Sequence, residues 1–86
     1  MLKKVIHMIN DYATEVMTDE VMFIGEESDC AKFVQEFADK HSTWDQDEYD
    51  DNEYSHVDSE GSYRIYLEDC SEKDKVGDIV AYYDAL

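Results

Sequence analysis

Side chains suited to binding a positively charged partner are concentrated in one central segment of the chain. Residues 45–60 hold eight of the 23 acidic residues and no Lys or Arg. Trp44, Tyr49 and Tyr54 lie five residues apart in and beside this segment. Carboxylates attract Lys and Arg, and aromatic side chains supply much of the binding energy at protein interfaces. The pattern indicates a protein-binding surface, and a solvated acidic loop that only keeps the chain soluble is the alternative.

The net charge of the whole chain limits the kinds of molecule that can bind it. Its 23 Asp and Glu against 7 Lys and Arg give a net charge of −16 and an isoelectric point near 4.1. DNA, RNA and anionic lipids are bound by basic surfaces, so direct binding to them is excluded. Duplex DNA presents one charge per roughly 110 Å². The eight acids would present one per roughly 170 Å² if they covered a quarter of the folded surface, so we expect a basic DNA-binding protein or nuclease as the partner.

The acidic segment, residues 45–60, is the predicted partner-binding site. Its carboxylates would take the place of DNA phosphates, and Asp58 and Glu60 would extend the surface if the hairpin tip lies beside the rest. Tyr49 and Tyr54 would supply apolar or stacking contacts, whereas the adjacent tryptophan would anchor the segment to the core. The predicted site residues are Asp45, Asp47, Glu48, Tyr49, Asp50, Asp51, Glu53, Tyr54, Asp58 and Glu60.

Metal-binding and catalytic patterns are missing from the sequence. Residues 45–56 resemble a calcium loop only in part, because an EF-hand needs an oxygen ligand, Gly and Glu where this run has Tyr49, Asp50 and His56. The histidines have no metal-ligand spacing with either cysteine. A Gly-rich phosphate loop, HExxH and GxSxG are also missing. We therefore predict no catalytic residue, no metal site and no cofactor.

Length and composition predict one folded domain that covers residues 1–86. At 10.1 kDa the chain is far shorter than chains that split into several domains. Its 43% hydrophobic content is too high for the low-hydrophobicity class of disordered chains. No apolar run approaches the ~20 residues of a membrane span, and the N-terminal residues are too polar for a signal peptide. Two cysteines without a CxxC motif fit a reducing compartment, so we expect a cytoplasmic protein.

Three segments have the apolar spacing of helices. An apolar stripe recurs every three or four residues over residues 2–17, although a strand pair turning at residues 11–14 is the alternative. Ser28 would cap a second helix that extends to about residue 41. Residues 71–74 resemble a capping box that opens a last helix, which Gly77 weakens. The expected inward residues of this last helix are Val76, Ile79, Val80, Tyr83 and Leu86.

Three further segments are typical of strands. Residues 20–25 form a short apolar run that Gly25 would end. Residues 54–57 and 62–67 alternate around a four-residue turn in which Gly61 suits the left-handed conformation. The expected core-facing residues of the last strand are Tyr63, Ile65 and Leu67. Together these elements predict an α+β fold in the order αβαββα, with three helices on a small three-stranded, mostly antiparallel sheet.

An expected helix with a Phe33-x-x-x-Phe37 face, followed by an acidic run with Trp44 and Tyr49, occupies residues 26–54. This stretch resembles small phage anti-CRISPR proteins of the DNA-mimic kind. In that family the acidic face resembles the DNA next to the protospacer, occupies the basic site of an RNA-guided nuclease and blocks target recognition. Here the acidic segment precedes a hairpin and another expected helix instead of ending the chain, so individual contacts are not carried over.

The resemblance and the charge pattern together predict a stoichiometric inhibitor. It would mimic DNA and block the basic nucleic-acid-binding site of a host defence nuclease, of the anti-CRISPR or anti-restriction type, in the cytoplasm of a host bacterium. One alternative is an acidic immunity or antitoxin protein that neutralises a basic nuclease toxin. Another is a calcium-responsive or purely structural acidic module. No enzymatic activity is expected.

Moderate salt should raise the melting temperature, because screening weakens the repulsion among acids that the seven cations cannot neutralise. Between about 20 and about 300 mM sodium chloride the screening length falls from roughly 20 Å to below 10 Å. Melting followed by circular dichroism across this range checks the expectation. A melting temperature that falls steadily over the range would contradict a crowded acidic surface.

Overall fold

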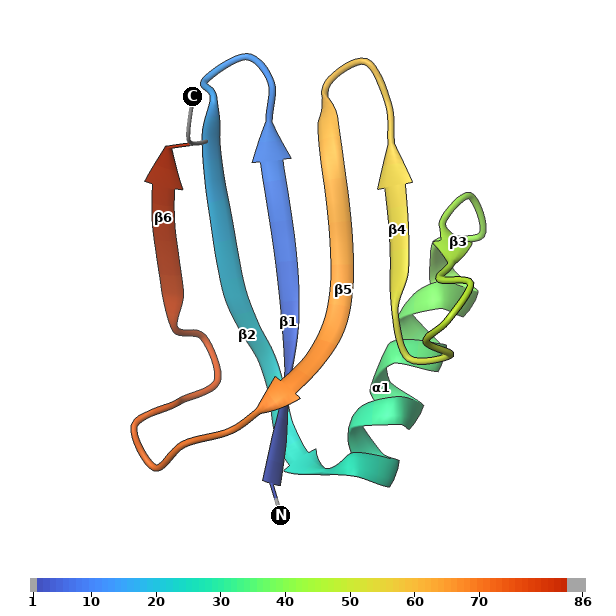
Figure 1. Ribbon diagram of the computed structural model, residues 1–86, viewed down its shortest axis with the longest axis vertical. Helices are drawn as coiled ribbons and strands as arrows, with labels where there is room; N and C mark the ends of the chain where they lie inside the picture. The colour runs from blue at the N-terminus through green and yellow to red at the C-terminus, as the bar shows by residue number, and fades with distance from the viewer. Residues whose placement is uncertain (1, 84–86) are drawn as a thin grey trace.

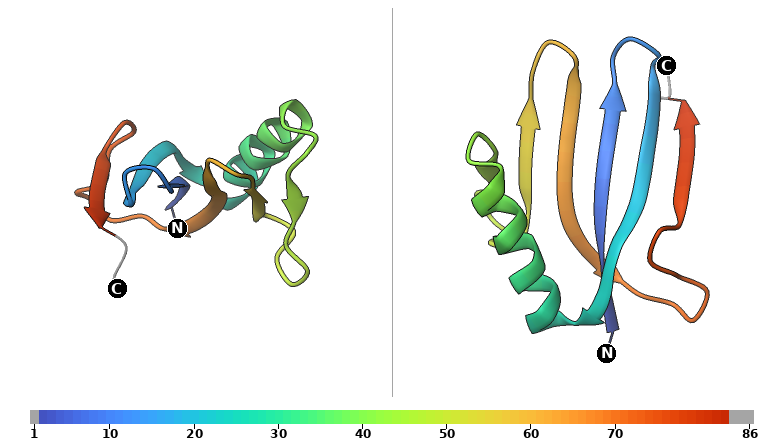
Figure 2. Two further views of the ribbon diagram at one scale, coloured as in Figure 1. Left: turned by 90° about the horizontal axis from the view of Figure 1, so that it is seen from above. Right: turned by 180° about the vertical axis from the view of Figure 1, so that it is seen from behind.

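An antiparallel sheet of six strands, with one helix against one of its faces, forms the part of the chain that the computed structural model describes, residues 2–83 (Figure 1). The strands lie in the order β3-β4-β5-β1-β2-β6, so the first strand along the chain is central. Figure 2 shows the helix on one side of a twisted sheet. The elements are β1 (Leu2–Asp11), β2 (Val16–Glu26), α1 (Glu27–Lys40), β3 (Asp45–Gln46), β4 (Tyr54–Val57), β5 (Gly61–Asp69) and β6 (Ile79–Tyr83).

The expected α+β arrangement, with three helices on a three-stranded sheet, is wrong first at the N-terminus, where residues 2–17 form a hairpin and no helix. β1 pairs with β2 along its whole length. In the connecting turn, the Asp11 carboxylate accepts a hydrogen bond from the Ala13 N–H at 3.0 Å, and Glu15 has a φ of 59°. The alternative interpretation of this segment, a strand pair, is therefore confirmed, with its turn at residues 12–15.

Burial of β1 on both faces explains why its sequence imitates a helix. Val5 packs under α1 and is fully buried, while Ile6, on the opposite face of the sheet, is only 4% exposed. Adjacent apolar residues are typical of a strand covered on both sides, and they also generate the spacing of an amphipathic helix. The β-branched side chains of Val and Ile then favour the strand.

β2 contains the short strand that the sequence predicts and continues it in both directions. Its register with β1 shifts at one point, because Val5 pairs with Phe23 whereas Ile6 pairs with Val21. Met22 is thus the extra residue of a β-bulge. Met22 and Phe23 both pack against the core beneath the helix, so the bulge supplies two apolar side chains to the same face.

The last expected helix is replaced by turns and by β6. The predicted capping interactions do form, since the Asp74 carboxylate accepts a hydrogen bond from the Ser71 N–H at 2.8 Å. Gly77 then has a φ of +93°, a left-handed conformation in which the chain leaves the helical path. The chain continues as β6, which pairs with β2 at the edge of the sheet.

The residues expected on the inner face of that helix lie outside the core. Val76, Ile79 and Val80 are 61%, 61% and 62% exposed. Leu86 and the side chain of Tyr83 lie outside the residues that the structure describes. β6 is at the end of the strand order, so the central strands of the sheet bury most of the apolar surface instead.

α1 confirms the second expected helix. Its buried residues are Cys30, Val34 and Ala38, spaced by four, and they face β1, β2 and β5. Ser28 is not the cap, because the helix begins at Glu27, with Glu26 at the N-cap and with no side-chain capping hydrogen bond. Acidic residues in the first turn complement the helix dipole instead.

β4 and β5 confirm the expected hairpin. Ile65 is fully buried, and Tyr63 and Leu67 are partly buried on the same face. Gly61 does not have the left-handed conformation expected for it, since the described residues with positive φ are found elsewhere. Its role is steric: a Cβ atom at Gly61 would lie 2.3 Å from the carbonyl oxygen of Asn10, so only glycine permits this approach of β5 to β1.

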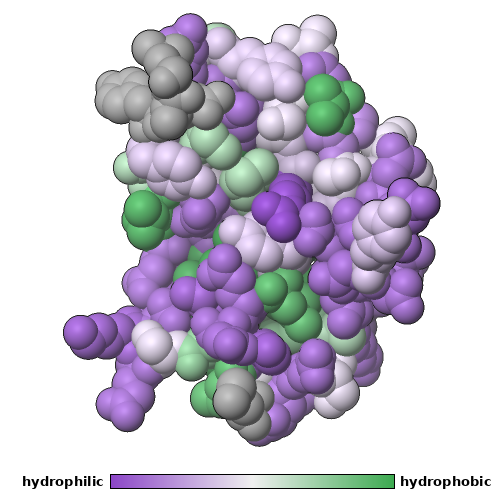
Figure 3. All heavy atoms as spheres, viewed as in Figure 1, coloured by the Kyte–Doolittle hydropathy of each residue, from purple (hydrophilic) through white to green (hydrophobic). Residues whose placement is uncertain are grey.

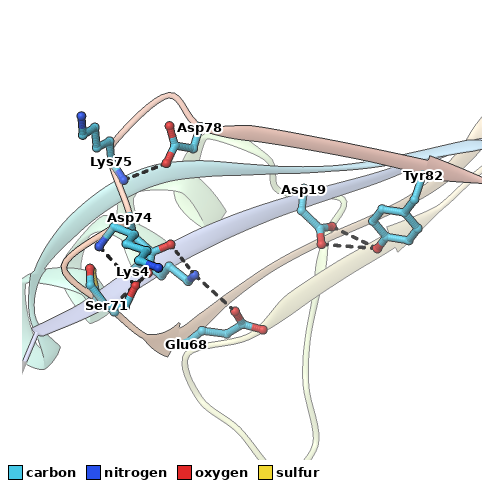
Figure 4. A network of polar contacts seen from close by, with 10 residues as sticks. Lys4, Asp19, Glu68, Ser71, Asp74, Lys75, Asp78 and Tyr82 are labelled. Atoms are coloured by element: carbon cyan, nitrogen blue, oxygen red, sulfur yellow. Dashed lines mark hydrogen bonds and ion pairs between the residues drawn. The ribbon is translucent and has the colours of Figure 1, made fainter.

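Polar side chains and the connection from β5 to β6 cover part of the sheet face opposite the helix. Lys4 Nζ lies 3.0 Å from Asp74 Oδ1 and 3.9 Å from Glu68 Oε2 (Figure 4). Arg64 lies over the Tyr66 ring, 4.1 Å from its centroid. The space-filling view in Figure 3 shows a mainly hydrophilic surface with separate hydrophobic patches. No single large apolar area is therefore visible on the described part of this side.

Ile65→Ala should lower the free energy of unfolding by about 2–5 kcal/mol, because it opens a cavity at a fully buried site. Val80→Ala, at a position that is 62% exposed, should change this free energy by less than about 0.5 kcal/mol. Urea unfolding followed by circular dichroism measures both. A large loss for Val80→Ala would contradict the exposed edge position of β6.

Candidate partner-binding site

The residues of the predicted site divide between two turns at opposite ends of β4. Residues 47–53 form the connection from β3 to β4, which we name the acidic loop, and Asp58 and Glu60 lie in the turn from β4 to β5 (Figure 1). Asp45 is an exposed residue of β3. Glu60 lies against the β1–β2 turn, where its carbonyl oxygen accepts a hydrogen bond from the Tyr12 N–H at 3.1 Å. The residues brought together in the acidic loop are Asp47, Glu48, Tyr49, Asp50, Asp51 and Glu53.

Hydrogen bonds within the acidic loop hold its shape. The Asp47 N–H donates to the Glu53 carbonyl oxygen at 2.8 Å and closes the loop at its base. The Asp47 carboxylate accepts a hydrogen bond from the Tyr49 N–H at 2.9 Å, and the Asp50 carboxylate accepts one from the Asn52 N–H at 2.8 Å. Such local turns fix the backbone. A carboxylate has two oxygens, so each aspartate keeps acceptor capacity for a partner.

Glu53 differs from the other acids of the loop because it forms an ion pair. Arg64 on β5 donates from Nε to one Glu53 oxygen at 2.7 Å and from Nη2 to the other at 3.1 Å. The hydrogen bond to Glu53 raises the pKa of Arg64. The charge of Glu53 is therefore balanced within the chain, and this residue ties the loop to β5. The sequence pattern contained no signal for this pairing.

The aromatic residues of the segment differ in exposure. Tyr49, in the acidic loop, is 91% exposed. Tyr54 packs against the core, and its hydroxyl donates to Gln35 Oε1 on the helix at 3.5 Å. Trp44 also packs against the core, as its expected anchoring role requires. Of these three side chains, Tyr49 is the one placed to make its main contacts with a partner.

Comparison of the whole chain with known proteins does not identify its family. No family model, curated protein or solved structure matches the chain. The resemblance to DNA-mimic anti-CRISPR proteins stays a prediction from residues 26–54.

A metal centre is not supported by the arrangement of ligands. Within residues 2–83, no group of three or more His, Cys, Asp or Glu side chains is arranged to hold a metal ion. The calcium-responsive alternative has no ligand set in this part of the chain. Cys30 and Cys70 are free cysteines, and burial raises the pKa of the Cys30 thiol. No helix among the described residues is both long and apolar enough to cross a membrane.

A second feature, which the sequence pattern does not reveal, gathers all three histidines around the single tryptophan. A pocket of about 380 Å³ lies where the end of α1 meets β1, β4 and β5, and we name it the aromatic pocket. The rings of His7, His41 and His56 have centroids 5.8, 5.6 and 6.2 Å from that of Trp44. Strand pairing with β5 brings β1 and β4 to the same place, so no spacing along the chain could have indicated this cluster.

His7 is the most deeply placed histidine of the aromatic pocket. Its Nε2 atom is buried and has no hydrogen-bond partner among the described residues. Burial lowers the pKa of His7, the neighbouring His41 lowers it further, and Glu20 opposes the shift. The folded protein therefore favours the neutral imidazole.

Acidification from pH 7 to pH 5 should destabilise the protein in part through His7. The unfolded chain takes up this proton near pH 6.5, whereas the folded chain takes it up only at lower pH, so the free energy of unfolding falls as the pH falls. His7→Phe should remove part of this pH dependence of the melting temperature, measured by calorimetry. His41→Phe removes an exposed histidine that itself lowers the pKa of His7, so it should remove a smaller part of the pH dependence than His7→Phe does. Equal pH dependence in the wild type and in His7→Phe would contradict a buried neutral imidazole.

Proposed function

We propose that this protein is a stoichiometric, non-catalytic inhibitor that mimics DNA and occupies the basic nucleic-acid-binding site of a DNA-handling enzyme. The observation that carries the proposal is the acidic loop. Four carboxylates that have no ion pair within the described residues flank Tyr49, whose side chain is 91% exposed, on a backbone held by its own hydrogen bonds. These acids are Asp47, Glu48, Asp50 and Asp51.

The chemistry of basic DNA-binding sites supports this choice of partner. Such sites hold phosphates with Lys and Arg, and Arg pairs with a carboxylate through the same bidentate geometry that it uses for phosphate. The loop offers four acids within five residues, 47–51, on a chain whose net charge is −16. Repulsion among these acids is relieved when a basic surface binds them. The proposed inhibitor therefore competes with DNA, and it does so without catalysis.

The ten predicted site residues have unequal roles in this proposal. The four unpaired acids and Tyr49 contact the enzyme. Glu53 and Tyr54 hold the loop on the sheet through Arg64 and the helix. Asp58 and Glu60 lie at the far end of β4 and are not part of the loop surface. The proposed place of action is the bacterial cytoplasm, where defence nucleases meet DNA and where both cysteines stay as free thiols.

Neutralising the four unpaired acids should weaken binding to the target at least about tenfold, mainly through slower association, because charge steers the encounter. The variant combines Asp47→Asn, Glu48→Gln, Asp50→Asn and Asp51→Asn. The target is the enzyme that the immobilised wild-type chain captures from a bacterial lysate and that duplex DNA displaces. Association and dissociation rates are then measured with the purified enzyme at several salt concentrations.

A matched variant with four exposed acids neutralised elsewhere controls for net charge. It combines Glu15→Gln, Glu27→Gln, Glu36→Gln and Glu72→Gln. This control should lose much less affinity than the loop variant, and both should keep the wild-type circular dichroism spectrum. Equal losses in the two variants, or a captured enzyme that duplex DNA cannot displace, would refute mimicry by the acidic loop.

A further inference from the structure

The aromatic pocket lies beside the strands that carry the acidic loop. Trp44 directly precedes β3, Asp58 directly follows β4, and both residues line the pocket. Its volume of about 380 Å³ is near the lower end of the range for ligand sites, roughly 300–1,000 Å³. A space of this size suits one small group, such as a single side chain of a protein that already touches the loop.

The walls of the pocket are mainly aromatic. The Phe37 and Trp44 rings meet at 74° with centroids 5.0 Å apart, and the Tyr63 ring lies 6.0 Å from Trp44. The His56 ring is within 19° of parallel to Tyr63. The faces of Trp, Tyr and Phe attract cations, and Trp does so most strongly. These walls therefore favour an occupant that is positively charged and has a planar or apolar body.

Asp58 gives the pocket a negative charge. Hydrogen bonds from the backbone N–H groups of Glu60 and Gly61 lower the pKa of Asp58, so its carboxylate is ionised at neutral pH. Its Oδ2 atom also lies 3.4 Å from Nε2 of His56. Neither Lys nor Arg is among the described residues that line the pocket. With a net charge of −16 on the chain, an anionic occupant is repelled and a cationic one is attracted.

His7 also lines the pocket, although its Nε2 atom is buried and is not exposed to the open space. Two kinds of cationic side chain can be compared. A lysine ammonium is a compact and strongly hydrated charge. An arginine guanidinium is planar and more weakly hydrated, stacks on aromatic rings and has five N–H donors. The arginine side chain therefore matches the aromatic wall and the carboxylate together.

We propose that the aromatic pocket binds the guanidinium group of an arginine side chain of the partner protein. Trp44 supplies the stacking face, and Asp58 supplies the opposite charge. This inference rests on the function proposed above, since enzymes that bind DNA present arginines at their basic sites. The acidic loop attracts the basic surface, and the pocket then selects one arginine from it.

The test uses a short peptide in place of the enzyme. Acetyl-Gly-Arg-Gly-amide is titrated into the whole chain at about 150 mM salt, and the fluorescence of Trp44, the single tryptophan, reports occupancy of the pocket. The same peptide with citrulline in place of arginine keeps the planar shape and lacks the positive charge. The same peptide with lysine keeps the positive charge and lacks the planar group. We expect saturable binding of the arginine peptide with a dissociation constant on the order of millimolar, at least about fivefold tighter than either analogue.

Two matched variants locate the binding. Asp58→Asn retains an oxygen that can accept the turn hydrogen bonds and removes the charge, so it should weaken binding of the arginine peptide at least about fivefold. Glu60→Gln removes one charge two residues away, from a side chain that does not line the pocket, and should keep the wild-type affinity within about twofold. Melting temperatures confirm that both variants fold.

The comparison of peptides on the wild-type chain decides the outcome even if a variant fails to fold. Equal binding of the arginine and citrulline peptides, equal binding of arginine and lysine, or no saturable fluorescence change would each overturn the inference. Equal effects of Asp58→Asn and Glu60→Gln would overturn it as well. The assay contains no enzyme, so a negative result does not bear on DNA mimicry by the acidic loop, which the fourfold loop variant tests separately. Conversely, if the loop variant binds the enzyme as tightly as the wild type does, the binding of the arginine peptide to the pocket is unaffected.

Discussion

The position of β1 between β2 and β5 is the constraint on which the rest of the structure depends. It places Val5 and Ile65, both fully buried, beneath Cys30 and Val34 of the helix. A chain of 86 residues buries only a small core, so these four side chains carry a large share of the hydrophobic stabilisation. This packing fixes the position of the helix on the sheet. The position of the aromatic pocket, which lies at the end of the helix, is fixed with it. The pairing of β4 with β5 then sets where the acidic loop leaves the sheet.

The few cations of the chain hold its elements together. Lys3 pairs with an acid of β5, Lys4 with acids of β5 and of the connection that follows it, and Arg64 with the base of the acidic loop. These ion pairs lie at or near the surface, where screening by solvent keeps their contribution to stability small. Their larger effect is on the distribution of charge. Three of the seven positive charges are matched in this way, and none of these ion pairs involves the acids at residues 47–51 of the loop.

Local signals in the sequence predicted the helix and the β4–β5 hairpin. Each of these elements buries apolar side chains on one face only, and each is bounded by residues typical of a helix start or of a turn. The same reasoning failed for residues 2–17, where Val5 and Ile6 are buried on opposite faces and the adjacent pair resembles a helical stripe. It failed again at the C-terminal segment, where capping residues are followed by Gly77 in a left-handed conformation. The composition of the acidic loop was predictable, but its ion pair with Arg64 was not. The histidine cluster depends on strand pairing between distant residues and has no local signal.

The central position of β1 also has a consequence for how the chain folds. β1 pairs with β5 so that Asp11 lies opposite Gly61, 50 residues later, whereas the β1–β2 hairpin and α1 need only local contacts. Pairing between distant strands is slow, since loop-closure entropy is lost before the contacts that compensate for it form. During synthesis the hairpin and helix therefore exist for a time with one edge of β1 open, and open edges promote pairing between chains. The net negative charge of the chain opposes such encounters, because like-charged chains repel one another.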